Sequence, residues 1–217
     1  MLSLAALFAA ASSFASADSI QFIGVPTGVN DGHYYDLPYE ISINGVDELV
    51  TCYDVFDDVN FGDKWQANLL SLSQASATGY FSADPGARAG YEEIAWLDAQ
   101  SYQNTAEQIG LQYAIWNVFG TYATTADSRA YTAQANLAAA SGYQGFNFTD
   151  VEFIEQIGGV VGRPGTEQAF VLTTPEASTL WLLLVGLTLV AAAHHLLHRR
   201  FQQSVVRVGI RRRQHLP

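Results

Sequence analysis

The chain has 217 residues, a formal charge of −11 and one cysteine. Residues 18–176 carry all 21 acidic residues and only four of the ten basic ones, so this part of the chain has a charge of −17. So acidic a segment excludes binding to nucleic acid or to anionic polymers by charge, and it favours attraction of cationic groups such as amines.

The first predicted element is an export signal at residues 1–17. An apolar run from Leu2 to Ala10 is followed by Ala15-Ser16-Ala17, which has the A-x-A pattern of a cleavage site. We therefore expect the mature chain to begin at Asp18. Residues 18–173 are then one exported domain, long enough to bury a hydrophobic core.

Strand-like alternation of apolar residues predicts β-structure from Ile20 to Phe56. The dipeptide Asn44-Gly45 separates two such runs and is a strong hairpin signal. The second of these runs ends in Leu49-Val50-Thr51-Cys52-Tyr53. The only cysteine, Cys52, is therefore expected on a strand or at its end.

The middle of the chain predicts helices. Apolar residues recur there at offsets of three and four. Thr105 and Gln108 resemble a capping box, and Gly120 is a plausible stop for the helix that they begin. The four predicted helices are Lys64–Gln74, Tyr91–Gln100, Thr105–Phe119 and Ser128–Ala140.

Strand patterns return at Val151–Ile157 and Gln168–Thr173. Strands, then helices, then strands predict an α+β domain, with an antiparallel sheet or sandwich that contains a helical insert. In the predicted helix Thr105–Phe119, Ile109, Gln112, Tyr113 and Trp116 share one face. That face is otherwise apolar and aromatic, so Gln112 is predicted to be buried, either hydrogen-bonded or chemically changed.

Two motifs carry a resemblance to a known family. Thr51-Cys52-Tyr53-Asp54 and Gly110-Leu111-Gln112-Tyr113-Ala114-Ile115-Trp116 resemble the two halves of the thioester domains of bacterial surface adhesins. The second motif departs from that family at Leu111, where the adhesins usually have threonine. The resemblance implies an internal thioester between Cys52 and Gln112, with no metal or other cofactor.

Such a bond implies a non-enzymatic function in covalent attachment. A lysine amine of a surface or matrix partner would attack the acyl carbon of Gln112 and release Cys52. Tyr53, Tyr113 and Trp116 flank the two residues in the sequence and are predicted to exclude water from the bond.

The C-terminal part of the chain predicts a membrane segment. Ser178 to Leu197 is almost wholly apolar and about long enough to cross a bilayer, and Arg199 and Arg200 follow it. Basic residues beside a span stay cytoplasmic, so residues 201–217 are predicted to be a cytoplasmic tail, with the domain outside.

Residues 174–200 also resemble the PEP-CTERM sorting signal of Gram-negative bacteria that make extracellular polysaccharide. The resemblance rests on Pro175-Glu176-Ala177, the short apolar span and the Arg199-Arg200 pair, although Ala177 replaces the second proline of the motif. It implies processing by an exosortase-type enzyme. The domain is then either anchored in the inner membrane or released to the cell surface or a biofilm matrix.

Other interpretations of these residues stay open. The domain could be a non-covalent structural or carbohydrate-binding matrix protein in which Cys52 is inert, since a cysteine is often a small buried apolar residue. A Cys–His hydrolase would pair Cys52 with His33. The run Asp54, Asp57, Asp58, Asn60 and Asp63 does not fit the spacing of an EF-hand loop, so an acidic solvated loop is expected rather than a calcium site. His194, His195 and His198 are expected at the inner membrane interface rather than in a metal site.

Overall fold

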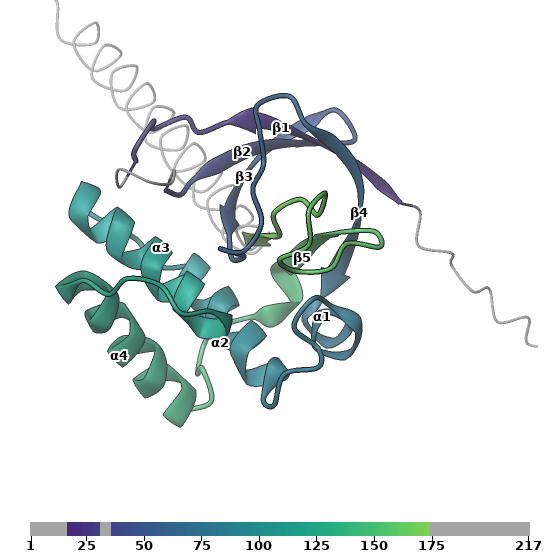
Figure 1. The fold of residues 1–217 in the computed structure, drawn as a ribbon. Helices are drawn as coiled ribbons and strands as arrows, with labels where there is room; N and C mark the ends of the chain where they lie inside the picture. Colours follow the sequence, from purple (N-terminus) through teal and green to yellow (C-terminus); the bar gives the residue numbers. More distant parts are fainter. Residues whose placement is uncertain (1–16, 31–35, 174–217) are drawn as a thin grey trace, which may run out of the picture. The chain divides into compact units, whose positions relative to one another are not determined.

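The computed structural model describes residues 17–30 and 36–173, which form a closed antiparallel barrel and four helices (Figure 1). The strands are β1 (Asp18–Gly24), β2 (Tyr39–Ile43), β3 (Val46–Cys52), β4 (Lys64–Ser71), β5 (Val151–Gln156) and β6 (Phe170–Thr173). The helices are α1 (Leu72–Thr78), α2 (Ala87–Asp98), α3 (Thr105–Phe119) and α4 (Ala126–Ala140). All four helices lie between β4 and β5 in the sequence. The predicted α+β class with a helical insert is confirmed, and the sheet is a closed barrel.

The barrel has the strand order β1-β2-β3-β6-β5-β4. The predicted hairpin is confirmed, because β2 and β3 pair up to Ile43 and Val46 with Asn44-Gly45 as the turn. Both turn residues have positive φ angles, 53° and 89°, as a two-residue turn of this type requires. This hairpin places Cys52 at the far end of β3, where β3 pairs with β6.

The predicted helix Lys64–Gln74 is wrong over most of its length. Residues 64–71 form β4, and only Leu72 begins a helix. Trp65 and Ala67 alternate with exposed neighbours and point into the barrel. The same apolar residues fit a period of two as well as a helical period, and pairing with β1 and β5 decides for the strand.

Two hydrophobic cores fill the molecule. The barrel core lies inside the strands and includes Cys52. The helical core lies between the helices and the outer face of β5 and β6. The fully buried members of the barrel core include Ile20, Ile41, Cys52, Ala67, Ile154 and Phe170; those of the helical core include Tyr91, Ile94, Leu97, Ile115 and Phe153.

Helix α3 contributes to both cores. Tyr113 and Trp116 belong to the barrel core, whereas Leu111 and Ile115 belong to the helical core. The helix has the predicted bounds and ends at Gly120, but its N-terminal cap is Asn104 rather than Thr105. The Asn104 side chain accepts hydrogen bonds from the N–H groups of residues 106 and 107. Because α3 is buried on most sides, polar side chains in its middle need partners inside the protein.

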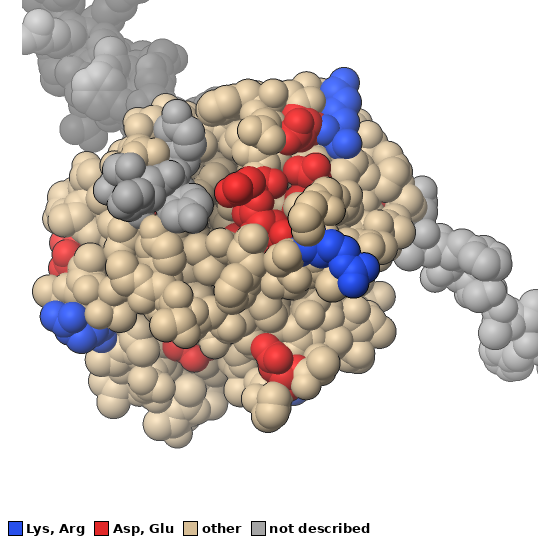
Figure 2. All heavy atoms as spheres, in the orientation of Figure 1, with Lys and Arg blue, Asp and Glu red and all other residues tan. Residues whose placement is uncertain are grey.

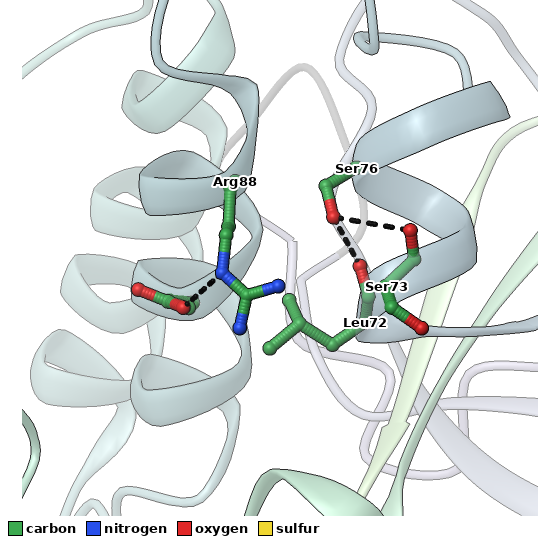
Figure 3. Close-up of polar contacts among 5 residues, drawn as sticks. Leu72, Ser73, Ser76 and Arg88 are labelled. Atoms are coloured by element: carbon green, nitrogen blue, oxygen red, sulfur yellow. Dashed lines mark hydrogen bonds and ion pairs between the residues drawn. The ribbon is translucent and has the colours of Figure 1, made fainter.

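The short helix α1 leads from β4 into the helical region and packs beside α2. The Ser76 hydroxyl donates to the carbonyl of Leu72, one turn earlier in α1 (Figure 3). On the surface of α2, Arg88 forms an ion pair with Glu92 at 2.9 Å. This exposed pair of side chains one turn apart contributes little to stability.

None of the helices in the described residues is both long and apolar enough to cross a membrane. The predicted export signal, the sorting motif Pro175-Glu176-Ala177, the predicted span and the basic tail lie outside the described residues.

Candidate functional site

Cys52 is the last residue of β3, and its side chain is fully buried in the barrel core. Cys52 forms no disulfide, and its Sγ donates a hydrogen bond to the main-chain oxygen of Asp54 at 3.0 Å. In the ladder between β3 and β6, the Tyr53 N–H donates to the carbonyl of Ala169. Hydrogen-bonded and non-hydrogen-bonded residue pairs alternate along an antiparallel ladder. Cys52 and Phe170 therefore form a non-hydrogen-bonded pair, and the Cys52 carbonyl points away from β6.

Gln112 supplies the partner for that carbonyl. It lies in the second turn of α3 and is fully buried, as predicted for the inward face of this helix. Its Nε2 donates to the Cys52 carbonyl oxygen at 2.6 Å, across 60 positions of sequence. The fold therefore brings the two residues of the predicted thioester pair into direct contact.

The other atom of the Gln112 amide has no such partner. Oε1 is buried, and among the described residues no group donates a hydrogen bond to it. An unpaired buried carbonyl oxygen costs about 1–3 kcal/mol, so native proteins rarely keep one without a reason. The carbonyl of Gln112 is also the group whose carbon a thiolate would attack.

Three aromatic side chains lie beside this contact. Tyr113 stacks on Trp116 with ring centroids 6.0 Å apart. The half-buried Tyr122 packs edge-on against both rings, at 4.8 Å from Tyr113 and 4.9 Å from Trp116. The side chain of Trp116 is also close enough to the Cys52 thiol to lower its pKa. Tyr122 was not among the residues that the sequence singled out, because it follows the end of α3.

Tyr53 has a different position from the other predicted flanking residues. Its ring packs in the helical core against Tyr91 and Phe153, on the opposite side of β3 from Cys52. Successive residues of a strand point to opposite faces, which separates Tyr53 from its neighbour. The Tyr53 hydroxyl donates to Glu155 at 2.5 Å and so fixes the strand end that carries Cys52.

Glu155 is a buried carboxylate that the sequence analysis missed. It accepts hydrogen bonds from the hydroxyls of Tyr53 and Tyr91 and from the Tyr80 N–H. Burial raises its pKa, and these three hydrogen bonds partly oppose that rise. The sequence contained a signal for this burial. Val151, Phe153 and Glu155 occupy every second position of β5, so the glutamate lies on the same apolar face as the other two.

The surroundings of the thiol hold it in its neutral form. Burial raises the pKa of Cys52 strongly, and the negative charge of Asp54 raises it further. The side chain of Trp116 and the hydrogen bond to the Asp54 main chain lower it only in part. The thiolate is the reactive form of cysteine, so chemistry at Cys52 requires a nearby group that takes the proton.

Asp54 and Asp57 form a pair of buried carboxyl groups beside the thiol. Burial, followed by the neighbouring Asp57, raises the pKa of Asp54 to about 8, although a hydrogen bond from the Phe56 N–H opposes this. Asp57 accepts a hydrogen bond from the N–H of Gly162 at 2.9 Å, which ties together the loops at this end of the barrel.

Further acidic residues lie around these loops. Glu167 is close enough to Asp63 and Asp57 for their charges to raise its pKa, after burial as the main cause. Figure 2 shows acidic side chains gathered in this part of the visible face. No group of three or more metal-ligating side chains occurs in residues 17–30 and 36–173, and Asp63 bonds instead to the N–H of Asn60. His33, the partner required by a Cys–His hydrolase, lies outside the described residues, as do His194, His195 and His198.

Comparison with protein-family models, with curated proteins and with solved structures finds no match to this chain.

Proposed function

We propose that the exported domain attaches itself covalently to amine-bearing partners through an internal thioester between Cys52 and Gln112. The observation that carries this proposal is the hydrogen bond of 2.6 Å from the Gln112 amide to the main-chain oxygen of Cys52, which holds the two residues side by side with both side chains fully buried. Holding two reacting residues next to each other lowers the barrier of their reaction, because it replaces a bimolecular encounter.

The chemistry balances within the two side chains. The Sγ–Cδ bond forms, the Cδ–Nε2 bond breaks, and ammonia leaves with the proton of the thiol. A partner amine then forms an amide with Gln112, the thioester bond breaks, and the proton of the amine returns to Cys52. The domain contributes position and exclusion of water, and it remains bound to the partner rather than turning over.

The surroundings support a long-lived acyl donor. Tyr113, Trp116 and Tyr122 cover the contact with packed rings, and Gln112 and Cys52 have no exposed surface. Water that cannot reach the acyl carbon cannot hydrolyse it. Acidic residues near the adjoining loops attract protonated lysines and raise the local concentration of amines.

The site of action that we propose is outside the cytoplasm. The export signal and the Pro175-Glu176-Ala177 sorting motif support a protein that is anchored in the inner membrane or released to the surface or matrix after exosortase-type processing. Amine-bearing surface or matrix molecules are the partners that fit this location. The charge of the domain argues against nucleic acid as a partner.

Intact mass of the purified full-length chain tests the proposal. We expect the chain to lack the mass of one ammonia and to gain one methylamine when it is treated with that amine. Digestion with trypsin and fragmentation should place the methylamine on Gln112. Gln108 is a matched internal control, because it is also buried in α3 but its amide donates to Leu37.

Cys52→Ala should abolish both the mass loss and the adduct. A wild-type chain of full calculated mass that takes up no methylamine would refute the thioester. That result would favour a non-covalent structural or carbohydrate-binding matrix protein in which Cys52 is inert.

A further inference from the structure

Asp54 carries a buried carboxyl group two residues from the cysteine of the proposed thioester. Asp54 follows Cys52 by two residues, and its side chain has no exposed surface. Oδ1 accepts a hydrogen bond from the Phe56 N–H at 2.8 Å. Oδ2 is buried and receives no hydrogen bond from any described residue. The neighbouring carboxyl of Asp57 is close enough to raise the pKa of Asp54 further after burial.

The thiol lies beside the same residue. Cys52 Sγ donates to the main-chain oxygen of Asp54 at 3.0 Å, and the Asp54 carboxylate exerts the largest effect of any charge on the thiol. The charges of described residues that mainly act on the two groups are negative: Asp54 and Asp57 act on the thiol, and Asp57 and Glu155 act on the Asp54 carboxyl group. These charges oppose a buried thiolate rather than stabilise it.

Charge conservation makes transfer to Asp54 the favoured route to a thiolate. Ionising Cys52 into solvent would leave two negative charges in a buried site. Moving the proton from Cys52 to an ionised Asp54 leaves one negative charge before and after the transfer. Burial disfavours added charge much more than it disfavours moving a charge already present.

We propose that the Asp54 carboxyl group is the proton shuttle of the Cys52–Gln112 pair, accepting the thiol proton when the thioester forms and returning a proton to Cys52 when an amine opens it. This inference rests on the proposed thioester function and names a residue that the function alone does not require.

With this shuttle, protons balance both when the thioester forms and when an amine opens it. During formation, Asp54 takes the proton from Sγ, the Sγ–Cδ bond forms, and Asp54 gives the proton to the departing nitrogen, which leaves as ammonia. During attachment, the partner amine bonds to Cδ, Asp54 protonates the departing Sγ, and the amine proton replaces the one that Asp54 gave. No oxidant, metal or further reactant takes part.

Among the described residues, the groups that act electrostatically on Asp54 are acidic or neutral. They are Cys52, Tyr53 and Asp57 from its own segment, Tyr80 from the turn after α1, and Glu155 from β5. Burial raises the pKa of Tyr53 and Tyr80 as well, so these hydroxyls stay neutral. Glu155 is held by three donors of its own, and Asp57 is the carboxyl group that raises the pKa of Asp54 most after burial.

The experiment follows thioester formation in the full-length chain during cell-free synthesis, with intact mass recorded over time at several pH values. We expect the wild-type rate to rise with pH as Asp54 ionises. Asp54→Asn should be slower by about a hundredfold or more and should lose this rise, since general acid–base catalysis contributes at least that much. Asp54→Glu should restore part of the rate. Asp58→Asn, a matched change at an exposed carboxylate four residues away, should behave like the wild type.

Consumption of the thioester by methylamine gives a second readout in the unaltered wild-type chain. The rate of thioester opening, divided by the concentration of unprotonated methylamine, should fall as pH rises, because the ionised Asp54 has no proton to give. This measurement decides the question if Asp54→Asn does not fold.

The possible failures are distinguishable. A wild-type chain that never loses ammonia overturns both the thioester and the shuttle. A wild-type chain that forms the thioester, together with an Asp54→Asn chain of equal rate and equal pH profile, overturns the shuttle alone. A methylamine rate per free amine that does not fall with pH also overturns it.

Discussion

Opening the thioester should destabilise the domain by an amount that the fold determines. The proposed bond would join the end of β3 to the second turn of α3, where Gln112 and Cys52 lie 60 positions apart in the sequence. A cross-link of this span restricts the unfolded chain, and the loss of loop entropy corresponds to about 4 kcal/mol at 25 °C. For a domain of this size, that free energy corresponds to a fall in melting temperature of roughly 10 °C.

The assay compares thermal unfolding of the full-length wild-type chain before and after treatment with methylamine. Treatment changes only Gln112, and the added methyl group in a packed site costs a further 1–3 kcal/mol or so. Cys52→Ala, which lacks both the bond and the methyl group, should unfold below the untreated wild type and should not respond to methylamine. A treated wild-type chain that carries the adduct but melts at the untreated temperature would show that the bond does not cross-link the fold as described.

Three further predictions concern the cover, the buried carboxyl groups and helix packing. Tyr122→Ala should speed spontaneous hydrolysis of the thioester, measured as water uptake by intact mass, because it removes the half-buried ring over Trp116; unchanged hydrolysis would mean that this ring does not exclude water. The free energy of unfolding should fall as pH rises from about 4 to about 8, because burial raises the pKa of Asp54 from 3.8 in the unfolded chain to about 8, so the folded state binds the additional proton. Asp54→Asn should flatten this fall in denaturant titrations, and an equally steep fall in the variant would assign it to other groups. Gly110→Ala should destabilise the domain by about 1–3 kcal/mol in the same titrations, because the new Cβ would lie 2.5 Å from Cβ of Asp127 on α4; a gain in stability would mean that α4 moves aside without cost.

The elements that the sequence predicted well are those with local signals. Asn44-Gly45 produced a two-residue turn, and α3 runs between Thr105 and Phe119 as its apolar spacing and Gly120 indicate. Local signals failed at residues 64–71, where pairing with two strands distant in sequence outweighed a helix-like spacing. Closure of the barrel likewise depends on contacts that no local pattern records.

The candidate site was predictable as a set of residue types but not as a geometry. The sequence pointed to Cys52 and Gln112, and the inward face of α3 explained why the glutamine is buried. The sequence did not show that Tyr53 lies apart from Tyr113 and Trp116. Which face of the sheet a residue near a strand end points to depends on the register of that strand. The sequence also indicated that Asp54 is part of a solvated acidic loop, whereas the loop folds back and buries that carboxyl group.

The arrangement of the two motifs has a consequence for the attached state. The acyl group stays on Gln112, in the helix that belongs to both cores, whereas Cys52 and the barrel become free of it. In the proposed reaction, attachment to a partner would remove the cross-link between barrel and helices at the moment when the domain is first held from outside. Only non-covalent contacts would then join α3 to the barrel, so the stability lost on opening the thioester would also set how firmly an attached domain resists being pulled apart. The free energy of unfolding before and after amine treatment measures this coupling between stability and attachment.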